Sequence, residues 1–338
     1  MRKKVKVMQK VNQIIEVRNL KKYFKTNKNS YLKSVDDVSF SISKGEILGL
    51  IGESGCGKST TGKTLLKLYA PTGGSVKYKD KILYDVEQNI WMPKKELATL
   101  RKDIQIIFQD PYLSLDPKQC IQKALSEGAI KHEVVDKKEV KEDCEEMLQI
   151  CGINPNLITR FPHEFSGGQR QRLCIARALE VTPEVLICDE PVSALDVSIQ
   201  AQVLNLMKEI QKEMNLTYLF IAHDLSVVQY MSDRIMVMYL GKIVEVADSK
   251  ALYDEPLHPY TKALISAIPV ADIHYKKKRQ VLEGEVPSPI HKPSGCAFHN
   301  RCPYCMDICK KEDPALRYHG ADGHMTACHL YDGSEVNA

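Results

Sequence analysis

The sequence contains no apolar run of the roughly 18 residues that a membrane-spanning helix needs. No apolar segment follows the basic residues at its start either, which argues against a secretory signal. We therefore expect a cytoplasmic chain that reaches a membrane only by docking on other subunits. Strong charge is also missing, because the formal net charge is +4 over 338 residues, and this argues against a dedicated nucleic-acid binder.

Cysteine, in contrast, is present in 11 copies, and its distribution is uneven. Cysteines are scattered between Cys56 and Cys188, where a reducing compartment would leave them as inert core residues. The others gather between Cys296 and Cys328 in a proline-rich setting. A small segment without an evident hydrophobic core usually needs a disulfide or a bound metal for stability. Four thiolates could bind Zn²⁺ or an iron–sulfur cluster, and the spacing alone does not decide between them.

The apolar pattern indicates alternating strands and helices. We predict strands at residues 14–17, 38–42, 47–51, 185–188 and 218–221. We predict helices at residues 58–68 and 199–215, and a mainly helical subdomain over about 115–180. The nearly continuous apolar character of the later strands suits a parallel sheet that is covered on both faces. This order indicates an α/β fold. After residue 254 the composition changes, and we expect an extension or small domain that does not continue the sheet.

A phosphate-binding loop is the clearest motif. Residues 52–59 fit G-x-x-x-x-G-K-[ST], and they follow a predicted strand and open a predicted helix. Glycines let backbone N–H groups surround phosphate oxygens, and the helix start adds partial positive charge. We expect Lys58 to reach the β- and γ-phosphates and Ser59 to offer a hydroxyl to Mg²⁺. The expected nucleotide contacts are Gly52, Glu53, Ser54, Gly55, Cys56, Gly57, Lys58, Ser59 and Thr60.

Two carboxylates end the apolar strand at residues 185–188. Asp189 stands at the strand tip, where it suits Mg²⁺ directly or through water. Glu190 follows, where it could orient or deprotonate an attacking water. Beside a phosphate loop, this pair is a candidate catalytic site for hydrolysis of a nucleoside triphosphate.

A third motif precedes these carboxylates in the chain. Ser166, Gly167, Gly168 and Gln169 follow Phe165 and open a helix, which creates a second possible anion site. This sequence resembles the signature motif of ATP-binding-cassette (ABC) proteins. The resemblance implies a P-loop ABC cassette with a RecA-like core, antiparallel β and helical subdomains, and a small cysteine-rich extension. It also implies that the motif completes the ATP site of a second subunit in a head-to-tail dimer.

Other expected site residues come from the same resemblance. Gln109 resembles the glutamine that touches Mg²⁺ or water and contacts the transmembrane subunits. Asp196 ends a segment similar to the loop that crosses the dimer interface. His223 resembles the switch histidine that contacts the γ-phosphate, and Glu190 the residue that drives hydrolysis. Phe24 or Tyr23 resembles the aromatic residue that stacks on adenine, with spacing slightly favouring Phe24.

Long segments narrow the resemblance to the importers of peptides and nickel, and within them to the F-type ATP-binding subunit of oligopeptide or dipeptide permeases. These segments are residues 52–60, 105–115, 162–179, 188–203, 221–228 and 256–269. The resemblance implies an ABC ATPase domain at 12–255 and a transporter-type C-terminal region at 256–338. It implies a second ATP-binding subunit, in a heterodimer, two permease subunits and an extracytoplasmic substrate-binding protein. The expected location is the cytoplasmic face of the cell membrane.

The resemblance also bears on the cysteines. It implies a [4Fe–4S] cluster held by Cys296, Cys302, Cys309 and Cys328, with Zn²⁺ as the alternative. Cys305 departs from the family pattern, so that one ligand could be exchanged. A structural role is expected for such a cluster.

Three alternatives stay open at this point. The cargo could be nickel or a related small solute. The chain could be a soluble cassette ATPase that acts on nucleic acid or ribosomes, although those proteins usually carry two cassettes or a long coiled coil, and no sustained heptads occur here. It could also be a metal-binding module with an inactive cassette, but the full set of phosphate, magnesium and base residues argues against that.

Overall fold

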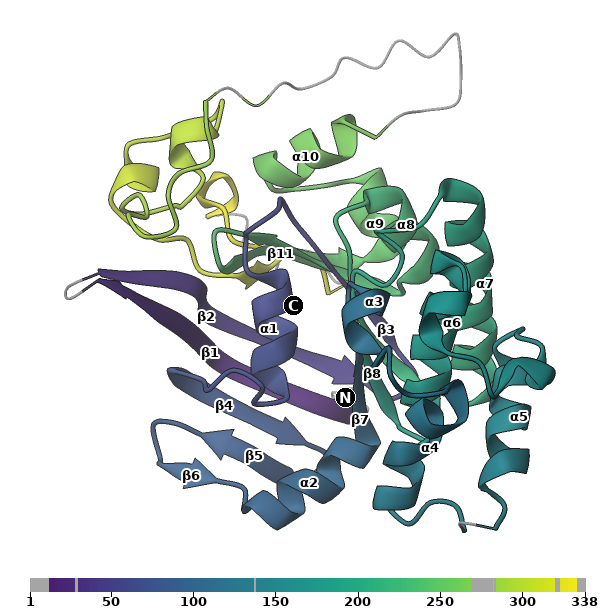
Figure 1. Ribbon diagram of the computed structural model, residues 1–338. Coiled ribbons are helices and arrows are strands. Elements are labelled where there is room, and N and C mark those ends of the chain that lie inside the picture. Colours follow the sequence, from purple (N-terminus) through teal and green to yellow (C-terminus); the bar gives the residue numbers. More distant parts are fainter. Residues whose placement is uncertain are drawn as a thin grey trace, which may run out of the picture.

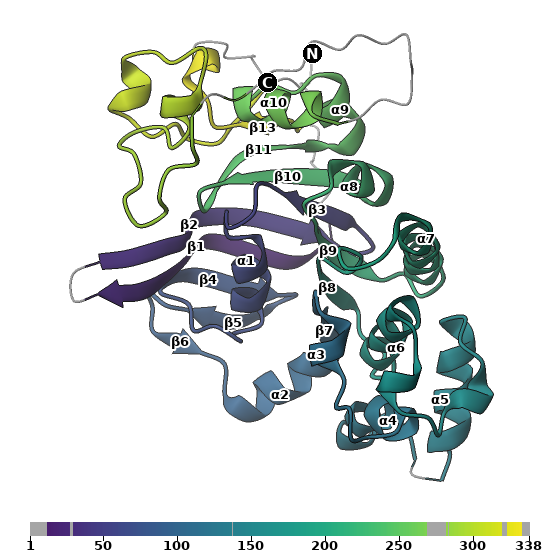
Figure 2. The ribbon, with the colours of Figure 1, turned by 45° about the horizontal axis from the view of Figure 1, so that its top comes forward.

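The computed structural model describes residues 12–27, 30–136, 138–268, 282, 284–319 and 323–332. Two sheets organise the chain, as Figures 1 and 2 show. Among the helices of the described ranges, none has both the length and the apolar character needed to cross a membrane.

The larger sheet forms the nucleotide-binding core, in the order β12-β13-β11-β10-β3-β9-β8-β7. The five strands from β10 to β7 are parallel to one another. Every residue of β3, β8 and β9 is buried, which explains their continuous apolar sequences. The strands of this sheet are β3 (Ile47–Ile51), β7 (Ile104–Ile107), β8 (Val185–Asp189), β9 (Thr217–Ile221), β10 (Arg234–Tyr239), β11 (Lys242–Asp248), β12 (Arg317–Tyr318) and β13 (Met325–Thr326).

The smaller sheet is antiparallel throughout, in the order β2-β1-β4-β5-β6. Helix α1 (Lys58–Leu65) lies between this sheet and the core sheet in both ribbon views. Leu65 of α1 packs with apolar residues of both sheets in one buried cluster. The strands are β1 (Gln13–Asn27), β2 (Ser30–Ser43), β4 (Gly73–Tyr78), β5 (Lys81–Asp85) and β6 (Ile90–Trp91).

Helices cover the remaining faces. The expected helical subdomain over residues 115–180 contains α4 (Ile121–Lys131), α5 (Val140–Ile150) and α6 (Gly167–Leu179). Cys144, Leu148 and Leu173 are fully buried between these helices. The other helices are α2 (Lys94–Asp103), α3 (Pro111–Ser114), α7 (Val197–Glu213), α8 (Leu225–Met231), α9 (Ser249–Asp254) and α10 (Pro259–Ser266). Short 3₁₀ turns are η1 (Pro155–Leu157), η2 (Pro162–Glu164), η3 (His299–Arg301), η4 (Ile308–Lys310) and η5 (His329–Tyr331).

The predicted α/β cassette with antiparallel and helical subdomains is confirmed, but one expectation about the extension is wrong. Strand β13 pairs with β11, and β12 pairs with β13, so the extension adds two strands to the core sheet. The reason is that β11 would otherwise leave an unpaired edge. Strands of two residues carry no periodic apolar pattern, and the sequence therefore gave no sign of them.

Candidate nucleotide-hydrolysis site

The phosphate loop leaves the end of β3 and turns into α1. Gly52 has φ 155° and Gly57 has φ 111°, conformations that residues with side chains rarely adopt. A Cβ atom would lie 2.2 Å from the Met238 carbonyl oxygen at Gly52, and 2.0 Å from the Ser34 carbonyl oxygen at Gly57. Only glycine fits these positions, and the backbone can therefore make the tight turn that a phosphate-binding loop requires.

Lys58 is held at the base of this loop. Its Nζ atom donates to the carbonyl oxygens of Gly52, at 2.8 Å, and Glu53, at 3.2 Å. The residue is only 4% exposed. The ammonium group is thus fixed beside the N-terminus of α1. A bound phosphate would therefore contact both the positive charge of Lys58 and the partial positive charge of the helix N-terminus.

Asp189 and Ser59 form the expected oxygen pair. Ser59 Oγ donates to Asp189 Oδ1 at 2.6 Å, and Lys63 Nζ lies 3.4 Å from Asp189 Oδ2. Asp189 is 1% exposed, and its buried carboxylate is stabilised by the hydrogen bond from Ser59 and the positive charge of Lys63. Carboxylate and hydroxyl oxygens are the donors that Mg²⁺ prefers, and this donor set fits the ion. Lys63 was not predicted, although it lies on the same helix as Ser59, four positions further on.

Three polar side chains converge beside this pair. Glu190 Oε2 accepts a hydrogen bond from Gln109 Nε2 at 3.0 Å and lies 3.1 Å from His223 Nδ1. These residues follow β8, β7 and β9, neighbouring parallel strands whose carboxyl ends meet at one edge. Glu190 itself has φ 50° and donates its N–H to the Ile221 carbonyl oxygen at 2.9 Å. The backbone thus turns the carboxylate away from the strand and toward the other two side chains.

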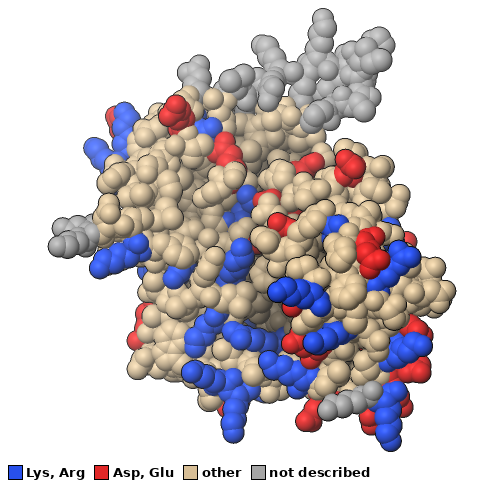
Figure 3. All heavy atoms as spheres, viewed as in Figure 1, with Lys and Arg blue, Asp and Glu red and all other residues tan. Residues whose placement is uncertain are grey.

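A cavity of about 560 Å³ connects these groups, within the range of small-ligand sites. It is lined by Phe24, Leu32, Ser34, Ser54, Gly55, Gly57, Lys58, Ser59, Thr60, Gln109, Glu190 and His223. Figure 3 shows Lys and Arg side chains, with Asp and Glu among them, over the lower half of the face viewed in Figure 1. Leu32 and Ser34 were not predicted, because an ordinary strand pattern does not distinguish them.

The two aromatic candidates take different positions. Phe24 lines the cavity, in edge contact with Tyr69 and with Lys22 Nζ 4.5 Å from its ring centre. Tyr23 is not among the lining residues, and its hydroxyl donates to Asp36. This arrangement favours Phe24 as the residue that meets a base.

The signature-like motif lies elsewhere. Ser166 caps α6, where its Oγ accepts from the Gln169 N–H at 3.3 Å and its own N–H donates to Gln169 Oε1 at 3.0 Å. Ser166 and Gln169 are exposed, and the cavity lining includes no residue of 166–169. Asp196, at the start of α7, is also exposed and absent from the lining. The chain therefore presents these groups outward and does not use them in its own cavity.

The cysteines of the extension lie near one another. Burial first, and then the neighbouring thiols of Cys309, Cys328 and Cys302, raise the pKa of Cys296 to about 12. Burial first, and then Cys302 and Cys309, raise the pKa of Cys328 to about 11. The Cys296 N–H also donates to the Cys309 carbonyl oxygen at 2.8 Å. Within the described residues, however, no three Cys, His, Asp or Glu side chains stand as a ready metal site, and the predicted cluster stays a prediction.

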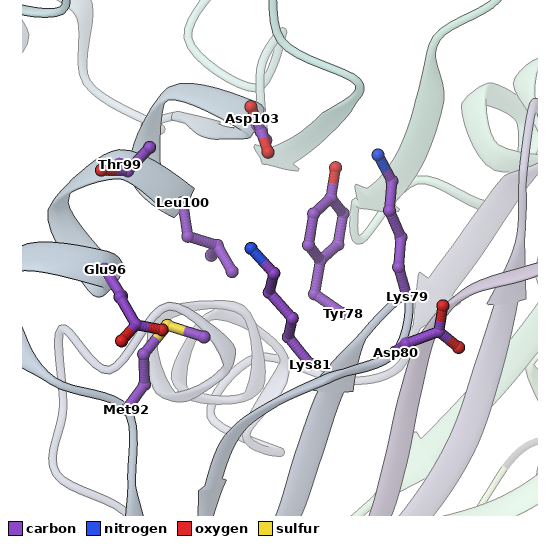
Figure 4. Close-up of a pocket in the computed structure, with 9 residues that line it drawn as sticks. All are labelled: Tyr78, Lys79, Asp80, Lys81, Met92, Glu96, Thr99, Leu100 and Asp103. Carbon is purple, nitrogen blue, oxygen red and sulfur yellow. The ribbon is translucent and has the colours of Figure 1, made fainter.

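A second cavity, of about 330 Å³, lies between the β4–β5 turn and α2. In Figure 4 the Tyr78 and Lys81 side chains project into the space faced by Leu100 of α2, with Glu96 and Met92 at its edge. It contains no phosphate loop and no paired carboxylates, and the site at Glu190 is the stronger candidate for chemistry.

Two family profiles match the chain. The profile described as "ABC transporter" matches residues 35–193, and that described as "Oligopeptide/dipeptide transporter, C-terminal region" matches residues 244–309. The first spans the phosphate loop, Gln109, the signature-like motif and the two carboxylates. The second spans α10 and four of the clustered cysteines.

Similar proteins point the same way. An oligopeptide transport ATP-binding protein of Bacillus subtilis, AppF, is 50% identical, with 94% of this chain and 97% of that protein covered. The oligopeptide transport ATP-binding protein OppF of Escherichia coli is 46% identical, covering 93% of this chain and 95% of that protein. Among solved structures, the dimeric ATP-binding cassette MJ0796 bound to ADP and phosphate matches with a TM-score of 0.62 at 25% identity, covering 70% of this chain and 98% of that one.

Proposed function

Since the chain belongs to the ABC transporter family of ATPases, we propose that it is the ATP-binding subunit of an importer for oligopeptides or dipeptides. The convergence of Gln109, Glu190 and His223 on a cavity beside the phosphate loop carries the ATPase part of this proposal. The names of the similar proteins and the profile at residues 244–309 support the cargo.

We propose a domain division at 255/256, with a helical subdomain at about 115–180. Residues 269–281, 283, 320–322 and 333–338 lie outside the described part.

Hydrolysis follows from the position of Glu190. ATP lies with its phosphates against the loop and Lys58, and with adenine toward Phe24. Glu190 accepts a proton from a water molecule that attacks the γ-phosphate, while His223 and Gln109 orient the carboxylate and the water. Mg²⁺, held by Ser59 and Asp189 with Gln109 nearby, would neutralise phosphate charge when bound.

The outward motif indicates partners. Ser166, Gly167, Gly168 and Gln169, with Asp196, would complete the ATP site of a second ATP-binding subunit, in a heterodimer. The dimeric state of the similar cassette bound to ADP and phosphate supports the pairing of two ATP-binding subunits. Two permease subunits would contact the exposed region around Gln109, where Tyr112 is 64% and Leu113 is 87% exposed. An extracytoplasmic protein would deliver the cargo, and the chain would work on the cytoplasmic face of the membrane.

We propose that Cys296, Cys302, Cys309 and Cys328 hold a [4Fe–4S] cluster, with Zn²⁺ as the alternative. Burial first, and then Cys302 and Cys309, raise the pKa of both Cys296 and Cys328, which supports this grouping. Among these cysteines, Cys305 contributes only to the raised pKa of Cys302, after burial and Cys309. Anaerobic purification with iron, sulfide and zinc analysis tests it. About four irons per chain supports the cluster. Stoichiometric zinc, or no metal, removes it and leaves the cassette untouched.

The experiment for the main proposal uses the full importer. The chain is expressed with its partner ATPase and permease subunits, placed in vesicles, and supplied with ATP and labelled di- or oligopeptides. Peptide uptake that depends on ATP and stops in Glu190→Gln supports the proposal. Uptake of nickel without uptake of peptides would overturn the proposal that the cargo is a peptide. Co-purification with RNA or ribosomes, without permease subunits, would overturn transport.

A further inference from the structure

The C-terminal extension contacts two residues that neighbour the lining of the nucleotide cavity, Glu53 and Asp36. In Figures 1 and 2 the yellow-green extension lies beside the β1–β2 hairpin, near the end of the chain and far in sequence from the phosphate loop. Among the ion pairs that join the described extension to the cassette, one from Arg301 reaches Glu53 and one from Lys292 reaches Asp36.

Arg301 reaches the phosphate loop itself. Its guanidinium donates from Nη1 to Glu53 Oε2 at 2.9 Å and from Nη2 to Glu53 Oε1 at 3.2 Å. The Arg301 side chain is 7% exposed and that of Glu53 is 27% exposed. Such a two-bond, mostly buried pair fixes orientation as well as distance, unlike an exposed pair on flexible side chains.

The backbone N–H, the carbonyl oxygen and the carboxylate of Glu53 all make hydrogen bonds. Its N–H donates to the Tyr260 hydroxyl at 2.9 Å, its carbonyl oxygen accepts from Lys58 Nζ at 3.2 Å, and its carboxylate pairs with Arg301. Tyr260 lies on α10 and Arg301 in η3, so both holding groups belong to the C-terminal part of the chain. Because Lys58 shares a hydrogen bond with Glu53, a shift of Glu53 moves an acceptor of the phosphate-binding lysine.

A second ion pair holds the hairpin that carries Phe24. Lys292 Nζ lies 3.1 Å from Asp36 Oδ2, with side chains 12% and 13% exposed. Asp36, on β2, also accepts the Tyr23 hydroxyl, and the next residue, Phe24, lines the cavity. The Asp36 N–H further donates to the Gly241 carbonyl oxygen at 2.8 Å.

From these contacts we propose that the C-terminal extension sets ATP affinity, with Arg301 and Lys292 as positioning residues for the phosphate loop and the Phe24 hairpin. Arg301 also neutralises the Glu53 carboxylate, which would otherwise repel the phosphates of ATP. The inference rests on the proposed nucleotide site. Neither residue touches the reacting atoms, so the expected effect falls on ATP binding and spares the chemical step.

The test compares Arg301→Gln with Arg317→Gln in the full chain. Arg317 forms an ion pair with Asp332 in the same extension, but its side chain is 62% exposed and does not line the cavity. Equilibrium binding of ATP is measured on the purified chain, and kcat and KM on the assembled importer. We expect Arg301→Gln to raise the Kd and KM for ATP about tenfold, as one unpaired charge near the phosphates would, with kcat within about twofold. Arg317→Gln leaves all three unchanged.

Further variants separate positioning from general stability. Glu53→Gln in the Arg301→Gln background removes the unpaired carboxylate and restores part of the ATP affinity. Lys292→Gln raises Kd by a smaller factor, because its link to the cavity runs through Tyr23. If Arg301→Gln does not fold, the Lys292→Gln result decides: an unchanged Kd overturns the proposal.

Other results contradict the inference directly. An unchanged Kd in folded Arg301→Gln overturns it, and so does a fall in kcat at unchanged Kd. An equal rise in Arg317→Gln shows a nonspecific effect and also overturns it. A wild-type chain that fails to bind ATP contradicts the nucleotide site instead, so the two failures are distinguishable.

Discussion

The phosphate loop and the signature-like motif are both glycine-containing starts of helices, yet the fold treats them in opposite ways. Gly52 and Gly57 are buried, with φ values of 155° and 111°, and their loop is held by contacts from distant parts of the chain. Ser166 and Gln169 are exposed, and their mutual hydrogen bonds are local to the first turn of α6. The difference supports the proposal that the chain completes one half of an ATP site itself and offers the signature-like motif to a second subunit. The following predictions test this contrast.

The largest effect is expected at Glu190, in the half that the chain completes itself. Glu190→Gln removes the group that accepts the proton of water, and we expect turnover to fall about 10²–10⁴-fold. ATP binding should persist, because Lys58 and the loop are unchanged. Steady-state hydrolysis by the purified importer and ATP binding by the chain measure both quantities. The exposed α5 variant Glu142→Gln is the control, and normal turnover in Glu190→Gln would refute the assignment.

A different pattern is expected for Ser166→Arg, in the motif offered to a second subunit. The isolated chain should bind ATP as tightly as the wild type, because Ser166 does not line its own cavity. The assembled importer should lose about 10²–10³-fold in turnover at the site that this motif completes, as when a phosphate-facing donor is removed. Ala98→Arg, on an exposed position of α2, should change neither quantity. Weakened ATP binding by the isolated variant chain would show that the motif acts within its own subunit.

Low pH should destabilise the phosphate loop at residues 52–57 before it affects the signature-like motif at residues 166–169. His258 accepts the Tyr260 N–H at 3.1 Å and caps the helix whose tyrosine holds Glu53. Complete burial lowers the pKa of His258 to about 4, although Glu245 acts in the opposite direction. The unfolded chain therefore takes up a proton before the folded one as the pH falls. Stability should drop by about 3 kcal/mol between about pH 6.5 and pH 4.

Thermal unfolding at several pH values measures this loss. Hydrogen exchange should show residues 52–57 opening before residues 166–172. His258→Asn keeps a capping side chain but does not titrate, so its stability should vary less over this interval. Equal pH dependence in the variant would exclude His258 as the cause.

The smallest effect is expected at Phe24, where the cavity would receive the adenine of ATP. Phe24→Ala removes a stacking surface and should weaken ATP binding by about 1–3 kcal/mol. Tyr23→Phe keeps the ring and loses only the hydrogen bond to Asp36, so a smaller change is expected. Comparing the affinity for ATP with the affinity for inorganic triphosphate isolates the contribution of the nucleoside, which carries the adenine. A larger loss in Tyr23→Phe would reverse the choice between the two aromatics.

Much of the candidate site was predictable because its residues lie in contiguous motifs. Residues 52–59 dictate a turn, an anion cradle and a helix start from local chemistry alone, and Asp189 with Glu190 mark the tip of a buried strand. Roles for Gln109 and His223 came from the family resemblance. Their hydrogen bonds with Glu190 depend on three strands being neighbours, which no single segment encodes.

The sequence by itself determined the α/β class, the phosphate loop and the carboxylate pair, because each depends on residues close together in the chain. Spacing favoured Phe24 only slightly over Tyr23, and tertiary structure decided that Phe24 lines the cavity. Tertiary structure alone decided that β12 and β13 extend the core sheet. It also decided that Arg301 holds Glu53 across 248 positions. Two-residue strands carry no pattern, and a long-range ion pair leaves no mark on the residues around either partner. Such contacts exist only once the sheet has brought distant segments together.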